Sequence, residues 1–280
     1  MSVEAAVTQY RQAFIDQFEV RSSALKNVGT TKESMKNGNT VTFLVAGSGT
    51  DAAVTRGVNG LIPYGNPTNT QVSATLVERH APYELTGFNI FSSQGDQKAI
   101  MRQASMSVIN REIDLTLLAE LANATIDTGT ATEANAELVL KARTYLGNNY
   151  INTNEEENMF AVVTDSFMAY LMQDDSFASA QYVDVKPAVG PTVKLKRWMG
   201  VNWYVSPLIT GVGTSEELCY MWHKNALGYA VNVGEENITI GYDEKQDTSW
   251  TRATIYHAAK ILQNTGIVQM KHDGSAFGLS

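Results

Sequence analysis

The sequence predicts an α+β fold. Strand-like runs enclose a long glycine-rich segment between residues 40 and 91, and a strong helical pattern covers residues 94–123. Short strands and helices follow in mixed order to the end of the chain, with no internal repeat or low-complexity tract. Because this order is irregular, an α+β arrangement fits the pattern best.

Composition and charge restrict the class of protein. The 280 residues allow a sizeable core, and the single cysteine, Cys219, allows no intramolecular disulfide. The formal net charge of −8 argues against a dedicated nucleic-acid-binding domain. Charged residues make up 18% of the chain, below the usual ~25%, so neutral polar residues fill much of the surface. Such a surface loses less hydration free energy when a partner covers it.

The N-terminal region predicts a short amphipathic helix followed by a connector. Residues 3–20 place apolar side chains three or four positions apart, which is helical spacing: Val7, Tyr10, Phe14 and Phe18. Residues 21–40 are polar and lack periodicity, so we expect an extended or loosely held connector. The aromatic stripe packs either on its own body or on a neighbour. The region lacks a signal-peptide pattern, and no apolar run approaches the ~18–20 residues of a membrane span, so we expect a cytosolic chain that does not enter a membrane.

Residues 40–91 predict a projecting β-arm. The outer runs are rich in β-branched and aromatic residues, whereas the middle holds five glycines and two prolines between Gly47 and Pro67. A loop of this length within one domain is uncommon and usually functional or disordered. We therefore expect an arm with little core of its own.

The following segment, residues 94–123, predicts a long helix. Its apolar residues form two adjacent stripes: Met101, Ala104, Val108, Leu115 and Leu118 on one, and Ile109, Ile113, Leu117 and Leu121 on the other. Arg111 and Asp114 are spaced at i, i+3 and can pair across the polar face. A helix approaching 30 residues would be about 40 Å long.

The second half predicts shorter elements. Residues 125–132 end the long helix, residues 134–149 read as the next helix, and residues 159–165 and 166–175 read as a buried strand and a short helix. Residues 192–208 read as a long strand with a turn at Gly200. Residues 218–231 fit a strand or a helix, residues 236–242 follow, and two closing strands cover 251–262 and 266–273.

Enzyme-like patterns are weak in this chain. Gly47 to Ala52 matches G-x-G-x-x-A after a strand-like run, but residues 55–67 contain too many glycines and prolines to form the helix that dinucleotide binding requires. The four histidines lie far apart without metal-ligand spacing, and Glu155–Glu157 reads as a solvated run. There is no G-x-S-x-G motif for a nucleophilic serine. We expect no catalytic residues, metal or cofactor, and the four tryptophans read as core residues, with interface anchoring as the alternative.

The order of elements resembles the major capsid protein of tailed bacteriophages with the Hong Kong 97 fold. Residues 96–125, DQKAIMRQASMSVINREIDLTLLAELANAT, look like its spine helix. ENMFAVVTDSFMAYLMQDDSF followed by VKLKRWMGVNWYVSPLI looks like its axial domain. The resemblance implies an N-terminal arm at 1–36, an extended loop at 37–91, a peripheral domain with the spine helix at 92–125 and 245–280, and an axial domain at 126–244.

The resemblance implies a structural protein of the virion that is made in the bacterial cytoplasm. It would assemble with itself as pentamers and hexamers into an icosahedral shell around double-stranded DNA, without sequence-specific binding. Because only residues 1–36 precede the loop, a separate scaffolding protein is implied, together with a portal and a cement protein. The loop holds no lysine, which argues against the Lys–Asn cross-link of some family members. An encapsulin-type shell and, least favoured, a soluble dinucleotide-binding enzyme are the alternatives.

Contacts between subunits are expected mainly on the arm, the loop and the long helix. The residues assigned to them are Tyr10, Phe14, Phe18, Val54, Arg56, Leu61, Ile62, Tyr64, Arg79, Arg111 and Asp114. The apolar loop residues have no core of their own to enter, so a neighbouring subunit would bury them. Arg56 and Arg79 are candidates for pairing with an acidic neighbour, and solvation is the alternative for both.

Overall fold

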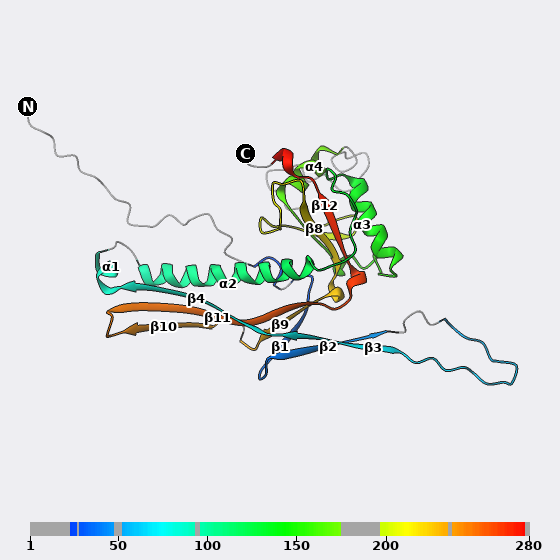
Figure 1. Cartoon of the computed structure of the whole chain (residues 1–280), viewed down its shortest axis with the longest axis horizontal. Coiled ribbons are helices and arrows are strands. Elements are labelled where there is room, and N and C mark those ends of the chain that lie inside the picture. The colour runs from blue at the N-terminus through cyan, green and yellow to red at the C-terminus, as the bar shows by residue number, and fades with distance from the viewer. Residues whose placement is uncertain are drawn as a thin grey trace, which may run out of the picture. The chain divides into compact units, whose positions relative to one another are not determined.

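The computed structural model describes residues 23–26, 28–47, 52–92, 96–174, 197–234 and 237–277 (Figure 1). These residues form a mixed fold of strands and helices, as the sequence predicts. The chain divides into two compact units. The first is formed by Glu78–Glu112 and Gly234–Tyr256, and the second by Ala24–Val77, Ile113–Val233 and His257–Ser280.

The first unit combines a small antiparallel sheet with helices. Its strands are β4 (Val77–Thr86), β10 (Asn237–Asp243) and the first part of β11 (Thr248–Ile261), and β11 pairs with both of the others. The sequence suggests a strand as far as residue 91, but β4 ends at Thr86 and a short helix, α1 (Gly87–Ser92), follows. The Thr86 hydroxyl accepts a hydrogen bond from the Asn89 backbone N–H, which favours the start of a helix there.

The long helix is confirmed as α2 (Gln97–Leu121), which is 25 residues and therefore about 37 Å long. The stripe Ile109, Ile113, Leu117 and Leu121 is buried throughout, as expected of a core face. The other stripe is only partly buried, because Leu115 is 40% exposed. The prediction of one merged apolar face is therefore wrong at Leu115.

The second unit has a five-stranded sheet in the order β12-β8-β5-β7-β6. The strands are β5 (Met159–Val163), β6 (Arg197–Trp198), β7 (Val201–Val205), β8 (Glu217–His223) and β12 (Ile267–His272). Helices α3 (Ala136–Asn148) and α4 (Asp165–Gln173) contribute to the same core. The Asn135 side chain caps α3 by accepting from the Leu138 N–H at 2.8 Å.

The last strand of the chain lies in the sheet of the second unit. Strand β12 pairs along its length with β8, in the sheet that contains β5. Its apolar residues Ile267, Val268 and Met270 are fully buried, so they need the larger core. The predicted domain boundaries, including the grouping of residues 245–280 with the long helix, stay predictions.

The connector predicted at 21–40 contains a strand. Thr31–Met35 forms β1, which pairs in parallel with β9 (Leu227–Asn232), and β9 pairs with the end of β11. Just before β1, the Trp222 indole N–H donates to the Gly29 carbonyl at 2.6 Å. A side chain at Gly29, whose φ is +70°, would meet the indole, so this approach requires glycine. Residues 218–231, open between strand and helix in sequence, form β8 and β9 joined by one 3₁₀ turn.

A buried polar cluster links several elements of the second unit. Glu217 on β8 and His272 on β12 are both fully buried, and their Oε2 and Nε2 atoms lie 3.8 Å apart. The Glu217 carboxylate accepts hydrogen bonds from the Thr164 and Ser166 hydroxyls at 2.5 and 2.6 Å and from the Gly213 N–H at 2.7 Å. His272 Nδ1 lies 3.1 Å from the Thr132 carbonyl oxygen. The cluster therefore fixes the start of α4 and the ends of two strands.

Burial of His272 makes stability depend on pH. Desolvation lowers its pKa from the usual 6.5, although Glu217, Asp273 and Glu133 oppose the shift. The unfolded chain therefore binds this proton more tightly, so the free energy of unfolding falls as pH drops below about 6.5. We expect urea unfolding of the purified chain to show a weaker pH dependence between pH 7 and 5 in His272→Asn. If the free energy of unfolding changed equally with pH in the parent chain and in His272→Asn, His272 would not be the source of the pH dependence.

Candidate assembly surfaces

The β-arm is a two-stranded hairpin with a long loop. Strands β2 (Thr40–Gly47) and β3 (Thr68–Thr75) pair in register from Thr40↔Thr75 to Gly47↔Thr68. Phe43 is buried at the base of the hairpin, where it packs with Val41 and Ala74 against Ala230 of β9 and Ala258 of β11. The β-arm thus has a small core at its base that anchors it, and only the loop beyond Gly47 lacks such a core.

The described part of the loop, residues 52–67, exposes its apolar side chains. Val54, Leu61, Ile62 and Tyr64 are between 47% and 96% exposed, and all four were predicted from sequence as contact residues. Residues 52–76 carry a single charge, that of Arg56. Exposed apolar side chains in a charge-poor segment are typical of a surface that a partner covers.

A compact turn shapes the loop. The Gly57 N–H donates to the Leu61 carbonyl, and the Gly60 N–H donates to the Gly57 carbonyl, both at 2.9 Å. Gly60 has a φ of +74°, a conformation that favours glycine. The Arg56 guanidinium donates to the Gly60 carbonyl at 3.1 Å, so it is held at the turn while it stays exposed.

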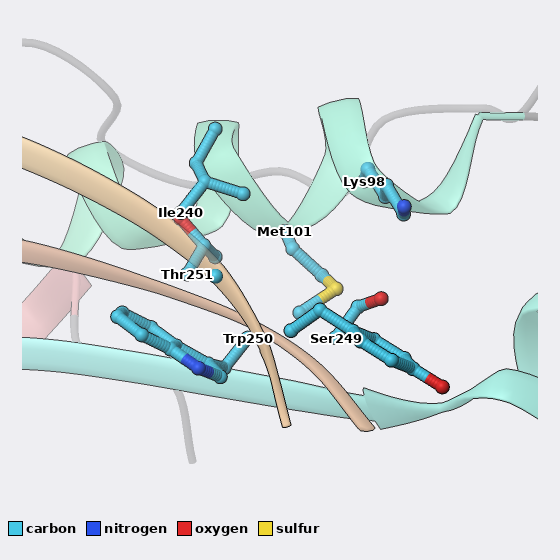
Figure 2. Close-up of a pocket in the computed structure, with 8 residues that line it drawn as sticks. Lys98, Met101, Ile240, Ser249, Trp250 and Thr251 are labelled. Carbon is cyan, nitrogen blue, oxygen red and sulfur yellow. The ribbon is translucent and has the colours of Figure 1, made fainter. Parts of the chain in front are cut away.

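The first unit carries a pocket of about 290 Å³ between α2 and the β10–β11 hairpin. Figure 2 shows Lys98 and Met101 reaching it from the helix, and Ile240, Ser249, Trp250 and Thr251 lining it from the strands. Gly241 lies opposite Trp250 in the hairpin, where a side chain would collide with the indole ring. The missing side chain at Gly241 therefore lets the indole approach the strand closely.

The turn next to this pocket is acidic. Residues 243–247 contain three carboxylates and one lysine. Tyr242, which lines the pocket and is 55% exposed, donates from its hydroxyl to Asp247 at 2.5 Å, and this hydrogen bond raises the pKa of Tyr242 above 10. The Asp247 carbonyl in turn accepts from the Gly87 N–H at 2.7 Å, which fixes the turn against the start of α1.

The other predicted contact residues are placed differently. Arg79 pairs with Glu112 of the same chain at 3.1 Å, and Arg111 is half-buried on α2. Asp114 is 1% exposed, and its carboxylate accepts hydrogen bonds from the Ala24 and Leu25 N–H groups at 3.0 and 3.2 Å. Asp114 therefore anchors the chain where it enters the second unit. Tyr10, Phe14 and Phe18 lie outside the described residues.

The described residues contain neither a cluster of metal ligands nor a membrane-spanning helix. Within the described ranges, no three His, Cys, Asp or Glu side chains gather in a way that would hold a metal ion. None of the described helices is long and apolar enough to span a membrane. The middle of the G-x-G-x-x-A match, residues 48–51, lies outside the described residues, and residues 52–57 that follow it are not helical.

Comparison with known proteins decides the family. A protein family described as phage capsid protein matches residues 3–274, nearly the whole sequence. The chain belongs to this family. It is therefore a structural capsid protein of the virion and not an enzyme, which confirms the resemblance seen in the sequence. No curated protein matches this capsid protein.

Solved phage capsid structures share the fold of this capsid protein. A chain from Mycobacterium phage Che8 aligns with a TM-score of 0.76 at 14% identity, over 96% of this chain and 98% of that chain. The capsid of the cyanophage P-SCSP1u gives 0.74 at 8% identity, over 95% and 92%. The capsid of Ralstonia phage GP4 gives 0.67 at 9% identity, over 98% of both chains. At such low identities the likeness establishes the fold alone.

The pocket beside α2 was missed by sequence reasoning. Met101 was assigned to an apolar stripe, and Trp250 to the core, but nothing local places the two side by side. The one available signal was the alternation Ile238, Ile240, Tyr242, which in a strand puts three large side chains on one face. All three are between 39% and 55% exposed.

Proposed function

We propose that this capsid protein assembles as pentamers and hexamers into an icosahedral head around double-stranded DNA, with the loop at 52–67 lying on a neighbouring subunit. The observation that carries the proposal is the loop itself, whose large apolar side chains are exposed and whose hairpin base is firmly packed. Burying such side chains against a neighbour removes apolar surface from water and so favours association.

Each predicted region has a proposed place in the capsid subunit. Residues 1–36 form the arm, 37–91 the extended loop, 92–125 and 245–280 the peripheral domain, and 126–244 the axial domain. The net charge of −8 suits an inner wall that does not hold packaged DNA tightly, since a basic lining would bind phosphates. A separate scaffolding protein, a portal and a cement protein are the proposed partners.

Particle mass tests this proposal. We expect the chain, expressed alone or with a scaffolding protein, to form closed particles or five- and six-fold rings of megadalton mass in light scattering and negative-stain images. The nucleic acid or protein content of particles from infected cells then separates a phage head from an encapsulin-type shell. A stable monomer of about 30 kDa under both conditions would refute assembly.

A further inference from the structure

We propose that the pocket between α2 and the β10–β11 hairpin receives the side chain of Tyr64 from a second copy of this chain. The inference rests on the proposed function and deepens it, because it names the surface on which the loop docks. It joins two features of the same sequence that are both exposed: a projecting aromatic side chain and a pocket of matching chemistry.

The pocket suits one amphipathic side chain. Its volume of about 290 Å³ lies just under the ~300 Å³ at which small-molecule sites begin, so it holds little more than one large side chain. Met101, Ile240 and Trp250 supply apolar surface, and the exposed Lys98 supplies a hydrogen-bond donor (Figure 2). A tyrosine fits this combination, because its ring is apolar and its hydroxyl can accept from an ammonium group.

Tyr64 is the side chain of the loop that meets these requirements. It is 96% exposed, the largest apolar side chain of the loop, and it lies between Pro63 and Gly65. No charged residue occurs from Gly57 to Val77, so the segment around Tyr64 enters an apolar pocket without desolvating a charge. Proline beside Tyr64 restricts the backbone, which reduces the entropy lost on docking.

A second contact fixes the direction of docking. The loop turn closed by Gly57 and Leu61 brings Arg56 close to the segment that leads to Tyr64, and the Gly60 carbonyl holds the guanidinium there. The pocket has its own neighbouring charges, because Tyr242 in its lining binds Asp247 of the acidic turn. The positive charge of Arg56 near Tyr64 is therefore complementary to the carboxylates of residues 243–247 near the pocket.

The aromatic stripe predicted near the N-terminus fits this place less well. Residues 3–20 carry the stripe of Tyr10, Phe14 and Phe18, but also three carboxylates and one arginine. The turn at 243–247 has the same sign of net charge and would repel that segment. Charge therefore favours the loop at 52–67 over the N-terminal arm as the segment that occupies the pocket.

Cysteine cross-linking tests the contact directly. The variant Asn66→Cys with Ile240→Cys keeps Tyr64 in place and puts one thiol beside it on the loop and one at the pocket. The native Cys219 is buried with its pKa raised to about 12, so it stays unreactive. Assembled particles are treated with a short bis-maleimide. We expect most subunits to run as covalent dimers and longer chains on a denaturing gel.

A second pair of cysteines controls for cross-links that form by random collision. Tyr150 is 95% exposed but belongs to the segment after α3, so Tyr150→Cys with Ile240→Cys should leave subunits monomeric on the same gel. Ladders of equal intensity from both pairs would overturn the proposal. A ladder from Phe14→Cys with Ile240→Cys, and none from the Asn66 pair, would assign the pocket to the N-terminal arm instead.

Assembly yield provides an independent measurement that needs no cysteine. Tyr64→Ala should lower the yield of particles at least tenfold, while Tyr64→Phe keeps most of it and Tyr150→Ala leaves it unchanged. Ile240→Trp, which fills the pocket, should act like Tyr64→Ala, and the double variant should lose little more. If Tyr64→Ala assembles as well as the parent chain, the docking proposal fails while the shell-forming function stands. If the parent chain forms no particles, the proposed function itself fails.

Discussion

Replacing residues 48–67 with a two-residue Asn-Gly turn should abolish particle formation and leave the subunit folded. Gly47 and Thr68 are the last paired residues of the β2–β3 hairpin, so a two-residue turn closes it in its native register. The described residues 52–67 are exposed and contribute nothing to the core, whereas Phe43 and Ala74 remain buried at the hairpin base. Closing a loop about ten times shorter also lowers the entropic cost of folding by about 2 kcal/mol.

Two measurements separate assembly from folding in that variant. Light scattering should show subunits or small oligomers only, and the midpoint of urea unfolding should equal or slightly exceed that of the parent chain. A length-preserving variant, with Val54, Leu61, Ile62 and Tyr64 changed to serine, should lose assembly as well. Its matched control changes polar residues of the same loop, Thr55, Asn59 and Asn66, to alanine and should still assemble. Normal particles from the shortened chain would show that the loop is not a subunit contact.

Local patterns account for what the sequence predicted correctly. The stripe from Ile109 to Leu121 recurs at helical spacing, and the strand at 159–163 is a continuous apolar run, so each could be recognised without its neighbours. The exposed loop was recognisable for the opposite reason, since its glycines and prolines exclude regular elements while its apolar residues lack periodicity.

The features that sequence reasoning missed depend on partners far away in the chain. Strand β1 forms because Thr31–Met35 finds the edge of β9, almost 200 residues later, and its own polar sequence gives no sign of this. Asp114 looked like one half of a surface ion pair with Arg111, but it is buried, where it binds the backbone of Ala24 and Leu25. Side chains that bind distant backbone leave no periodic signal.

Glu217 is the clearest example of such a distant role, and its removal should strongly destabilise the subunit. Glu217→Ala leaves the hydroxyls of Thr164 and Ser166 and the N–H of Gly213 without their acceptor. Thr164 also caps α4 by accepting from the Phe167 N–H at 3.2 Å, so the start of that helix loosens too. Losing a fully buried acceptor of several hydrogen bonds costs about 3–5 kcal/mol. That is a large share of the ~5–15 kcal/mol by which a typical domain is stable.

Urea unfolding of the unassembled subunit measures this loss of stability. Two further substitutions, at the same position and at the neighbouring one, serve as controls. Glu217→Gln should lose less than Glu217→Ala, because the amide oxygen still accepts from Gly213 and both hydroxyls can reorient toward the new group. Glu216→Ala, one position away on an exposed side chain, should stay within about 0.5 kcal/mol of the parent chain. If Glu217→Ala were no less stable than Glu216→Ala, the polar cluster would not hold β8 to α4. Only folded subunits assemble, so we expect the yield of particles to decrease as the free energy of unfolding decreases across the Glu217 and Glu216 variants. The loop variants should instead lose assembly without losing stability.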